Sequence, residues 1–286
     1  MIAHRDGSGS RVVYTTDALI EAPNWTGDGR ALIYNNDGRL FRISVDGGEG
    51  PHLISTAPLE NLNNDHCLSP DGATIYLSAN DGQLYAVPVG GGTAVQISTP
   101  KDQKRRFRHY LHGVSPDGRS LVYVGLEKTA AGQTVTNIYS QPVAGGDDRQ
   151  LTDGSWPVDG PEYSADGNWI YFNSEQTARR AGDAQIFRMG IDGSGVEQLT
   201  DDARVNWFPH MSPDGQTVVY LSFPEATIGH PADKQVIVRT MTPDGTPLID
   251  IDSFCGGQGT INVNSWSPDS AQFAYVAYPF ERLDPA

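Results

Sequence analysis

Two cysteines are all that the 286-residue sequence contains, and other features that define whole classes of protein are missing too. No apolar run has the length of about 20 residues that a membrane-spanning helix needs. The first residues, Met-Ile-Ala-His-Arg-Asp, also lack the apolar core of a signal peptide. The sequence therefore predicts a cytoplasmic protein, although a chain trimmed of its leader would look the same and would be periplasmic. Cys67 and Cys255 are expected to be buried free thiols rather than a disulfide.

Positive charge is scarce as well. The sequence has 20 Lys and Arg against 35 Asp and Glu, a formal net charge of −15, which excludes nucleic acid and an anionic membrane as partners. No Gly-X-Ser-X-Gly motif is present, which excludes a serine nucleophile elbow. The stretch "CGGQGT" lacks the following Gly-Lys-Ser/Thr of a phosphate loop, and we expect its glycines to form a tight turn. A close approach of this backbone to a ligand is the alternative.

A long apolar stripe with the 3.6-residue period of a helix is also absent, so the sequence predicts an all-β protein. It contains instead a repeated turn, Ser69-Pro70-Asp71-Gly72, whose aspartates are 43 to 55 residues apart, the length of one four-stranded propeller blade. Each copy precedes a run with the alternation of a half-buried strand, as in Thr74–Ser78. Five further copies stand at Thr26–Gly29, Ser115–Gly118, Ser164–Gly167, Ser212–Gly215 and Ser267–Ser270.

The six copies predict a six-bladed β-propeller with four antiparallel strands, A to D from the inside outwards, in each blade. Residues 1–15 resemble strands C and D, whereas Val263–Trp266 and Gln272–Ala277 resemble strands A and B. We therefore expect the last blade to be closed by N-terminal strands C and D beside C-terminal strands A and B, which leaves no open sheet edge. Residues 1–286 are expected to form this one domain.

The repeated turn, followed by strands such as Ile170-Tyr171-Phe172, resembles the WD-like repeats of the TolB-like propeller family. That family is related to the propellers of tricorn protease and of the prolyl oligopeptidases. The resemblance covers essentially the whole chain and implies the fold, but it implies little about chemistry, since propellers serve as scaffolds, binders and enzymes. The sequence has neither the N-terminal αβ domain of TolB nor a hydrolase domain.

Ten of the 20 Lys and Arg, Arg108 and Arg180 among them, lie in the loops expected on one face of the propeller, where ligands usually enter. Two interpretations stay open for this face: ordinary solvated loops, or an electrostatic funnel for an anionic ligand. Trp207 lies beside the same rim. Its ring either packs against the next blade or offers an apolar face to a sugar.

Strand A is expected to line the central channel, and three histidines lie on it just before the turn serine. We expect His66, His112 and His210 to point into one cavity, with a bulge at Pro209 bringing His210 into phase. Three imidazoles form a ligand set for Zn or Mn. A water-filled polar channel and a ligand site without metal are the alternatives. Asp65, Glu162 and Gln258 are expected at a similar depth.

Two functions remain open. In the first, the funnel binds or transforms an anionic small molecule or oligosaccharide, in analogy with the oligogalacturonate lyases, which are TolB-like propellers that use histidines and a divalent metal. The catalytic residues would be His230, Glu162 and His210, and the metal ligands His66, His112 and His210. The substrate-binding residues would be Arg108, Arg180, Trp207, Gln258 and Asp65. In the second, the chain is a non-enzymatic protein-interaction propeller, as TolB is.

Overall fold

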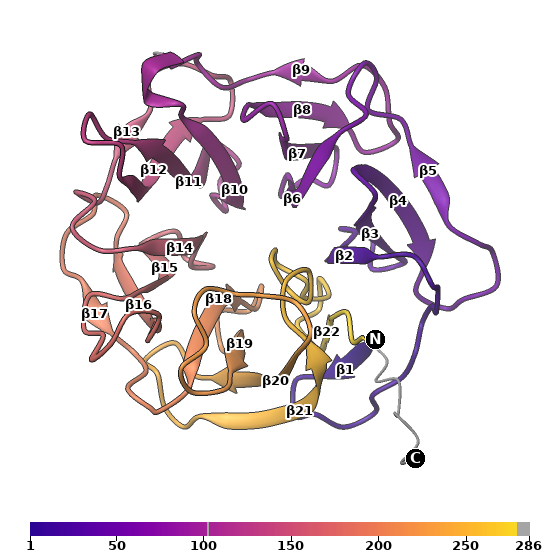
Figure 1. Ribbon diagram of the computed structural model, residues 1–286. Helices are drawn as coiled ribbons and strands as arrows, with labels where there is room; N and C mark the ends of the chain where they lie inside the picture. Colours follow the sequence, from indigo (N-terminus) through magenta and orange to yellow (C-terminus); the bar gives the residue numbers. More distant parts are fainter. Residues whose placement is uncertain (102, 279–286) are drawn as a thin grey trace, which may run out of the picture.

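The computed structural model describes residues 1–101 and 103–278, which form a ring of antiparallel sheets around a central axis (Figure 1). Five of the sheets have four strands each. In every one of these five, the strands follow chain order from the inside of the ring to the outside. Consecutive antiparallel strands need only a short turn between them, which is why turn residues recur so regularly in the sequence.

The strands of each blade follow from the innermost outwards. The first blade contains β2 (Ile20–Trp25), β3 (Ala31–Asn36), β4 (Arg39–Ser44) and β5 (His52–Ile54). The second contains β6 (Leu62–Leu68), β7 (Thr74–Ala79), β8 (Leu84–Pro88) and β9 (Val95–Gln96). A 3-10 helix, η1 (Gln103–Arg105), leads into the third, with β10 (Arg108–Val114), β11 (Ser120–Lys128), β12 (Thr134–Pro142) and β13 (Arg149–Gln150). The fourth contains β14 (Val158–Tyr163), β15 (Trp169–Ser174), β16 (Gln185–Gly190) and β17 (Glu197–Gln198). The fifth contains β18 (Val205–Met211), β19 (Val218–Phe223), β20 (Lys234–Met241) and β21 (Ile249–Gly256).

The prediction of six four-stranded blades is wrong, because the structure has five. In place of a sixth, β1 (Ile2–His4) pairs with β22 (Gln272–Ala274) in a two-stranded antiparallel sheet between the fifth blade and the first (Figure 1). Residues 5–10 and 257–265 form turns and bends instead of the further strands that a full blade needs. Segments from the two ends of the sequence nevertheless lie side by side in this small sheet.

All six copies of the repeated turn make the same side-chain hydrogen bonds. In each copy the Ser or Thr hydroxyl donates to the Asp two residues later, over 2.5 to 2.6 Å. The same hydroxyl accepts a bond from the backbone N–H five residues after it, as from Thr74 to Ser69 at 2.9 Å. These bonds fasten the end of each innermost strand to the start of the next, so the sequence motif fixes the hairpin.

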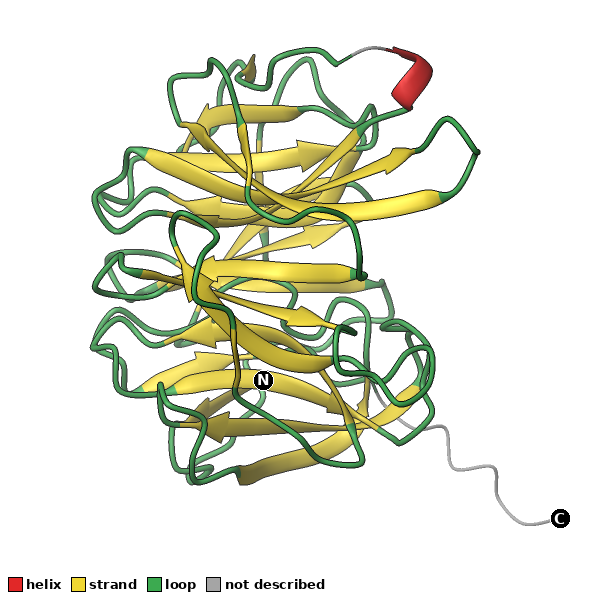
Figure 2. Ribbon diagram, turned by 90° about the vertical axis from the view of Figure 1, so that its left-hand side faces the viewer, coloured by secondary structure: helices red, strands yellow, loops and turns green. Residues whose placement is uncertain are grey.

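The six turns also touch one another in a closed ring. In five contacts a turn glycine lies against the turn before it, close enough that an added Cβ would come within 3.4 to 3.9 Å: Gly72 on Gly27, Gly118 on Pro70, Gly167 on Pro116, Gly215 on Ala165, and Gly29 on Pro268. The backbone N–H of Asp214 donates to Ser270 at 2.9 Å and completes the ring. We call this face the turn face and the opposite one the loop face. In Figure 2 the strands run between the two, and η1, in red, lies on the loop face.

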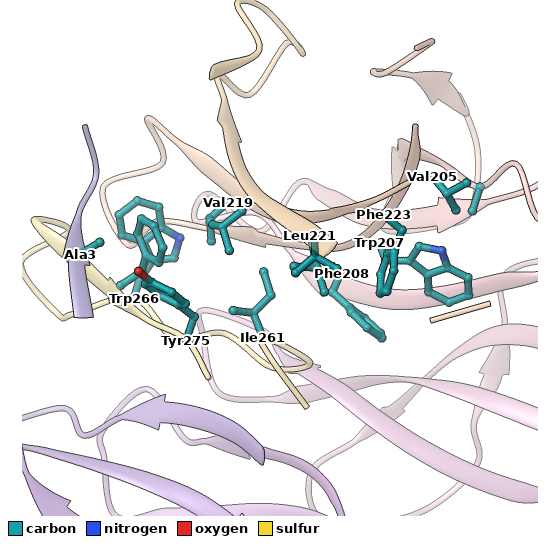
Figure 3. Close-up of a cluster of buried hydrophobic side chains, with 14 residues drawn as sticks. Ala3, Val205, Trp207, Phe208, Val219, Leu221, Phe223, Ile261, Trp266 and Tyr275 are labelled. Carbon is teal, nitrogen blue, oxygen red and sulfur yellow. The ribbon is translucent and has the colours of Figure 1, made fainter. Parts of the chain in front are cut away.

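Apolar side chains fill the spaces between neighbouring sheets. The cluster in Figure 3 joins Trp207 and Leu221 of the fifth blade to Ala3, Trp266 and Tyr275 from the two ends of the sequence. Burial of this apolar surface holds the two-stranded sheet in the ring. Both cysteines are free and buried, which confirms that prediction. No helix in residues 1–101 and 103–278 is long and apolar enough to span a membrane.

Candidate functional site

A bulge interrupts the pairing of each of the five innermost strands in the blades. The bulge predicted at Pro209 is present, between Trp207 and His210. Residues in three of the bulges adopt positive φ: 54° at Ala22, 57° at Gly160 and 55° at Phe208. A bulge redirects the neighbouring side chains. These strands therefore bring polar groups together at the axis, whereas regular strands would keep those groups apart.

His112, on β10, is the centre of the first polar cluster and is 3% exposed. Its Nδ1 lies 3.2 Å from the carbonyl oxygen of Asn262, and its Nε2 lies 3.2 Å from Oδ1 of Asp159. Both partners only accept hydrogen bonds, so both ring nitrogens donate and the imidazole carries a positive charge. Burial lowers the pKa of His112, but the hydrogen bond to Asp159 and the charge of Asp65 outweigh burial and raise the pKa to about 9.

Asp159, at the start of β14, links His112 to a second histidine. Its Oδ2 lies 3.7 Å from Nε2 of His230, whose Nδ1 donates to the amide oxygen of Gln258. Burial raises the pKa of Asp159, but the hydrogen bond from His112 and the charges of both histidines lower it further, below its usual range. The side chains of Asp159 and His230 are 23% and 30% exposed, so this end of the cluster is open to solvent.

Asp65, on β6, is the least satisfied group of the cluster. It is 4% exposed, and its carboxyl group makes no hydrogen bond within residues 1–101 and 103–278. Burial raises the pKa of Asp65 to about 7, with the charge of His112 acting against this shift and those of Asp159 and Glu21 adding to it. Asp65 therefore exchanges its proton near neutral pH, where a proton donor or acceptor is most effective.

A cavity of about 710 Å³ lies beside this cluster on the loop face. Gln258, the partner of His230, forms part of its wall. Amide and carboxyl side chains dominate the rest, and no Lys or Arg of the described chain lines it. The polar lining residues are Glu21, Asn35, Asn36, Asp37, Asn61, Asn63, Asn64, Asn80 and Gln258.

A second histidine–carboxylate pair lies deeper in the channel. His210, fully buried, bonds through Nδ1 to Glu162 and through Nε2 to the carbonyl of Ile261 at 2.6 Å. Glu162 also accepts bonds from the Asn264 amide and, at 3.3 Å, from the backbone N–H of Met211. Both nitrogens of His210 and both oxygens of Glu162 therefore have hydrogen-bond partners within the protein.

The three histidines predicted to share a metal do not converge. His66 is fully buried, and its Nδ1 donates to the carbonyl of Asn64 at 2.9 Å. Both nitrogens of His112 and both of His210 are already engaged in hydrogen bonds. In the described part of the chain no group of three or more His, Cys, Asp or Glu side chains is placed to hold a metal ion. The residues do not fit Zn or Mn, and the metal stays an untested prediction.

The other predicted residues divide between the cluster and its surroundings. Asp65, His230 and Gln258 belong to the cluster, whereas Glu162 and His210 form the separate deeper pair. Trp207 is 7% exposed and packs beside His230, with ring centres 4.6 Å apart. Arg108 donates to the carbonyl of Asn80 at 2.9 Å, and Arg180 forms ion pairs with Asp183 and Glu225. Asn80 lines the loop-face cavity, so Arg108 lies beside that cavity, whereas Arg180 contacts none of its lining residues in the described chain.

The predicted electrostatic funnel is weakened, because four of the ten basic side chains of these loops form ion pairs within the protein. Lys101, Arg105, Arg179 and Arg180 all form ion pairs. The glycines of "CGGQGT" have positive φ at Gly257 and Gly259, as a tight turn needs. They also allow a close approach, but to the protein itself: an added Cβ would lie 2.0 Å from the Pro231 carbonyl oxygen and 2.6 Å from Glu21.

Sequence reasoning missed Asp159, which connects the two histidines, and the asparagines of the loop-face cavity. One signal was available. Counted back five positions from each turn Ser or Thr, four of the six repeats have a polar or acidic residue: Glu21, Asn64, Asp159 and Asn262. Glu21, Asn64 and Asp159 lie at or beside a bulge, and the Asn262 carbonyl accepts a bond from His112, so their recurrence marks a polar ring at that level of the channel.

Comparison with known proteins gives one family. Residues 111–246 match the family model described as the TolB beta propeller domain, PD40. The chain is 42% identical over 272 residues to the uncharacterized protein Atu1656 of Agrobacterium fabrum, which covers 94% of this chain and 88% of that protein. A solved structure of an Agrobacterium tumefaciens protein assigned as TolB is 39% identical, covers 98% of this chain and 97% of the other, and superposes with a TM-score of 0.87.

Other similar proteins have lower sequence identity to this chain. The Tol-Pal system protein TolB of Francisella tularensis is 26% identical over 283 residues, which are 94% of this chain but 59% of that protein. The chain thus spans little more than half the length of this TolB. An oligogalacturonate lyase in complex with manganese is 11% identical, covers 89% of this chain and 73% of the other, and has a TM-score of 0.59. This likeness is one of fold alone.

Proposed function

The chain belongs to the TolB-like family of β-propellers, and from its own side chains we propose that it binds a small, hydroxyl-rich and uncharged ligand, such as a neutral oligosaccharide, on its loop face. The cavity of about 710 Å³ beside the His112–Asp159–His230 cluster carries this proposal. Its volume lies in the range of small-molecule sites. Family membership adds the scaffold and leaves the ligand open, since propellers serve many functions.

The lining of the cavity favours hydroxyl groups as the feature recognised. Six asparagines and Gln258 line it, and each amide offers both donors and an acceptor. A hydroxyl group also donates and accepts, so amides match it in either direction. Some of these amides are held by bonds to the backbone, such as Asn35 to the carbonyl of Asn63 at 3.0 Å and Asn80 to that of Leu62 at 3.1 Å. An amide fixed in this way has lost its rotational freedom before the ligand binds, which favours affinity.

The charge of the site argues against the anionic ligand that the sequence suggested. Glu21 and Asp37 line the cavity, and no Lys or Arg of the described residues balances them there. Elimination across a uronate requires the ligand carboxylate to be neutralised, but the described residues form no metal site, and Arg180 is already paired with Asp183 and Glu225. We therefore propose ligand binding rather than lyase chemistry.

Titration calorimetry with neutral and acidic oligosaccharides tests the proposal. We expect neutral sugars to bind, and Asn61→Ala and Gln258→Ala each to weaken binding roughly five- to ten-fold, the cost of about one hydrogen bond. Asn168→Ala is the matched control, because Asn168 is an asparagine with one side-chain bond on the opposite face. Binding of acidic sugars alone, or a new ultraviolet-absorbing product when they are added, would contradict the proposal. So would an equal effect of the control.

A protein partner is the second candidate function. Three large apolar side chains are exposed in connections of three different blades that open on the loop face: Leu19 at 61%, Trp156 at 52% and Ile228 at 75%. Exposed aromatic and aliphatic groups on one face are common at protein interfaces. If Trp156→Ala and Ile228→Ala abolish capture of a partner while sugars fail to bind at all, this second function replaces the first.

A further inference from the structure

The channel has a second cavity, on the turn face, that the loop-face ligand would not occupy. Its volume is about 430 Å³, within the range of small-molecule sites. Residues from all six repeated turns form its rim: Gly27, Pro70, Pro116, Ala165, Pro213 and Pro268. Because these turns touch one another in a closed ring, the mouth of the cavity has a fixed width.

The walls of this cavity are apolar and rich in aromatic rings. Trp25, Tyr163 and Trp266 contribute rings, and Leu68, Val114 and Met211 contribute aliphatic side chains. Such walls bind the hydrocarbon part of a ligand through the hydrophobic effect. Aromatic rings also attract a positive charge through their electron-rich faces.

One polar group of the cavity is an acceptor without a donor. Asn24 is 6% exposed, and its side-chain oxygen has no hydrogen-bond donor among the described residues, while its amide nitrogen is 3.4 Å from the His66 carbonyl. The Glu162 carboxylate is also in the lining, with its own hydrogen bonds already made. Both nitrogens of His112 bond elsewhere, and the Asn264 amide binds Glu162 and the Met211 carbonyl. The indole nitrogen of Trp25 has no partner in the described chain.

The electrostatic field at the mouth points to a cation. Each of the six turns carries an aspartate, and the hydrogen bond from the turn hydroxyl lowers the pKa of these carboxyls, so they are ionised at neutral pH. Exposed arginines pair with three of them, Asp28, Asp117 and Asp214. Asp71, Asp166 and Asp269 have no ion-pair partner in the described chain. A ring of carboxylates at a pore mouth concentrates cations there.

We infer that this turn-face cavity is a binding site for a small organic ammonium ion, with its hydrocarbon part between the aromatic walls and an N–H group on the side-chain oxygen of Asn24. The positive charge of His112 does not oppose this occupant strongly, because Asp159 and Asp65 on its other side compensate it. The ligand proposed for the loop face is neutral and rich in hydroxyl groups, whereas this ligand is positively charged and partly hydrocarbon. The two sites thus have independent tests.

Benzylamine, benzyl alcohol and benzoate form a matched set of probes, cationic, neutral and anionic, with the same ring. We expect benzylamine to bind at least about ten-fold more tightly than the other two by titration calorimetry, and its affinity to fall as salt rises. Asn24→Leu removes the acceptor and should weaken benzylamine about ten-fold, whereas Asn24→Asp should strengthen it. Gln258→Ala, on the loop face, should leave it unchanged.

Equal affinity for benzylamine and benzyl alcohol would overturn the inference, since it would leave an apolar cavity without preference for charge. Absence of any heat at millimolar benzylamine would overturn it too. Val114→Phe fills the cavity, and a folded Val114→Phe protein that still bound benzylamine would place the amine elsewhere. Because neutral sugars and benzylamine are measured separately, either site can fail without the other.

Discussion

The two histidine–carboxylate pairs of the channel differ in how completely the protein satisfies them. His210 and Glu162 are 0% and 8% exposed, and each is held by further bonds to backbone or amide groups. His112 and Asp159 lie in a cluster that stays open to solvent at His230 and contains Asp65 without a hydrogen bond. A fully satisfied buried pair fixes the fold, whereas a pair in an incompletely satisfied cluster is available for a ligand or a proton.

The largest effect is expected at the deeper pair. Glu162→Gln removes one carboxylate oxygen from this buried pair, and we expect it to lower the free energy of unfolding by about 3 to 5 kcal/mol, the cost of breaking a buried histidine–carboxylate pair. Urea denaturation measures this loss. Glu225→Gln is the matched control, because Glu225 pairs with Arg180 on the surface with 59% of its side chain exposed, and it should cost less than about 1 kcal/mol. If both variants lowered the free energy of unfolding by similar amounts, the buried pair would be no more important for stability than a surface ion pair.

The next effect is on pH dependence, and it comes from the open cluster. The folded-state pKa of Asp65 is about 7 against 3.8, and that of His112 is about 9 against 6.5. Both values are raised, so the folded state holds these protons more tightly than the unfolded chain does. Stability from Asp65 is therefore lost as pH rises from 3.8 to 7, and stability from His112 is lost between 6.5 and 9. Asp159, Glu21 and His230 are the other titratable groups that face this cluster.

We expect the free energy of unfolding to fall by roughly 2 kcal/mol or more between pH 5 and pH 9. In a plot of unfolding free energy against pH, Asp65→Asn should reduce the slope at the low-pH end, and Asp159→Asn should reduce it at the high-pH end. Urea denaturation at pH 5, 7 and 9 measures all three proteins. A wild-type curve that is flat, or that rises with pH, would show that the cluster is as fully satisfied as the deeper pair.

The smallest effect is expected at a pair outside the channel. Arg180→Ala breaks two exposed ion pairs and should change unfolding free energy by less than about 1 kcal/mol. Its effect on sugar affinity should be less than about two-fold, because the cavity walls are amides and carboxyls. Calorimetry with one neutral and one acidic sugar tests this. A large loss for the acidic sugar alone would restore the electrostatic funnel.

Much of the fold could be predicted because the turn motif carries its own hydrogen bonds. The Ser–Asp bond and the alternation after it are local, so each copy marks one hairpin whatever surrounds it. The number of full blades could not be predicted in this way. Ser267–Ser270 keeps the turn, but glycines in the flanking segments 5–10 and 257–265 adopt positive φ, at Gly7, Gly9, Gly257 and Gly259, which interrupts a regular strand.

The site could be predicted only in part, because the bulges decide which side chains meet. His66 and His112 stand at the same distance before their turns, yet His112 bonds to Asp159 while His66 bonds within its own strand, and it is Asp65 whose pKa responds to the channel charges. A one-residue change of register exchanges the two faces of a strand. Sequence spacing alone therefore could not distinguish Asp65 from His66, and it gave no reason to select Asp159.

The two-stranded sheet has a consequence for the order in which the molecule is made. Ile2 pairs with Ala274, so β1 cannot pair with β22 until all five blades have been synthesised. Until then the edge of β1 and the apolar side chains that later meet Trp266 and Tyr275 stay uncovered. Contacts so distant in sequence form late and slowly, and an unpaired edge invites association with other chains. A ribosome stalled before residue 272 would therefore hold five blades in an open ring, and the emergence of residues 272–274 is the step that closes it.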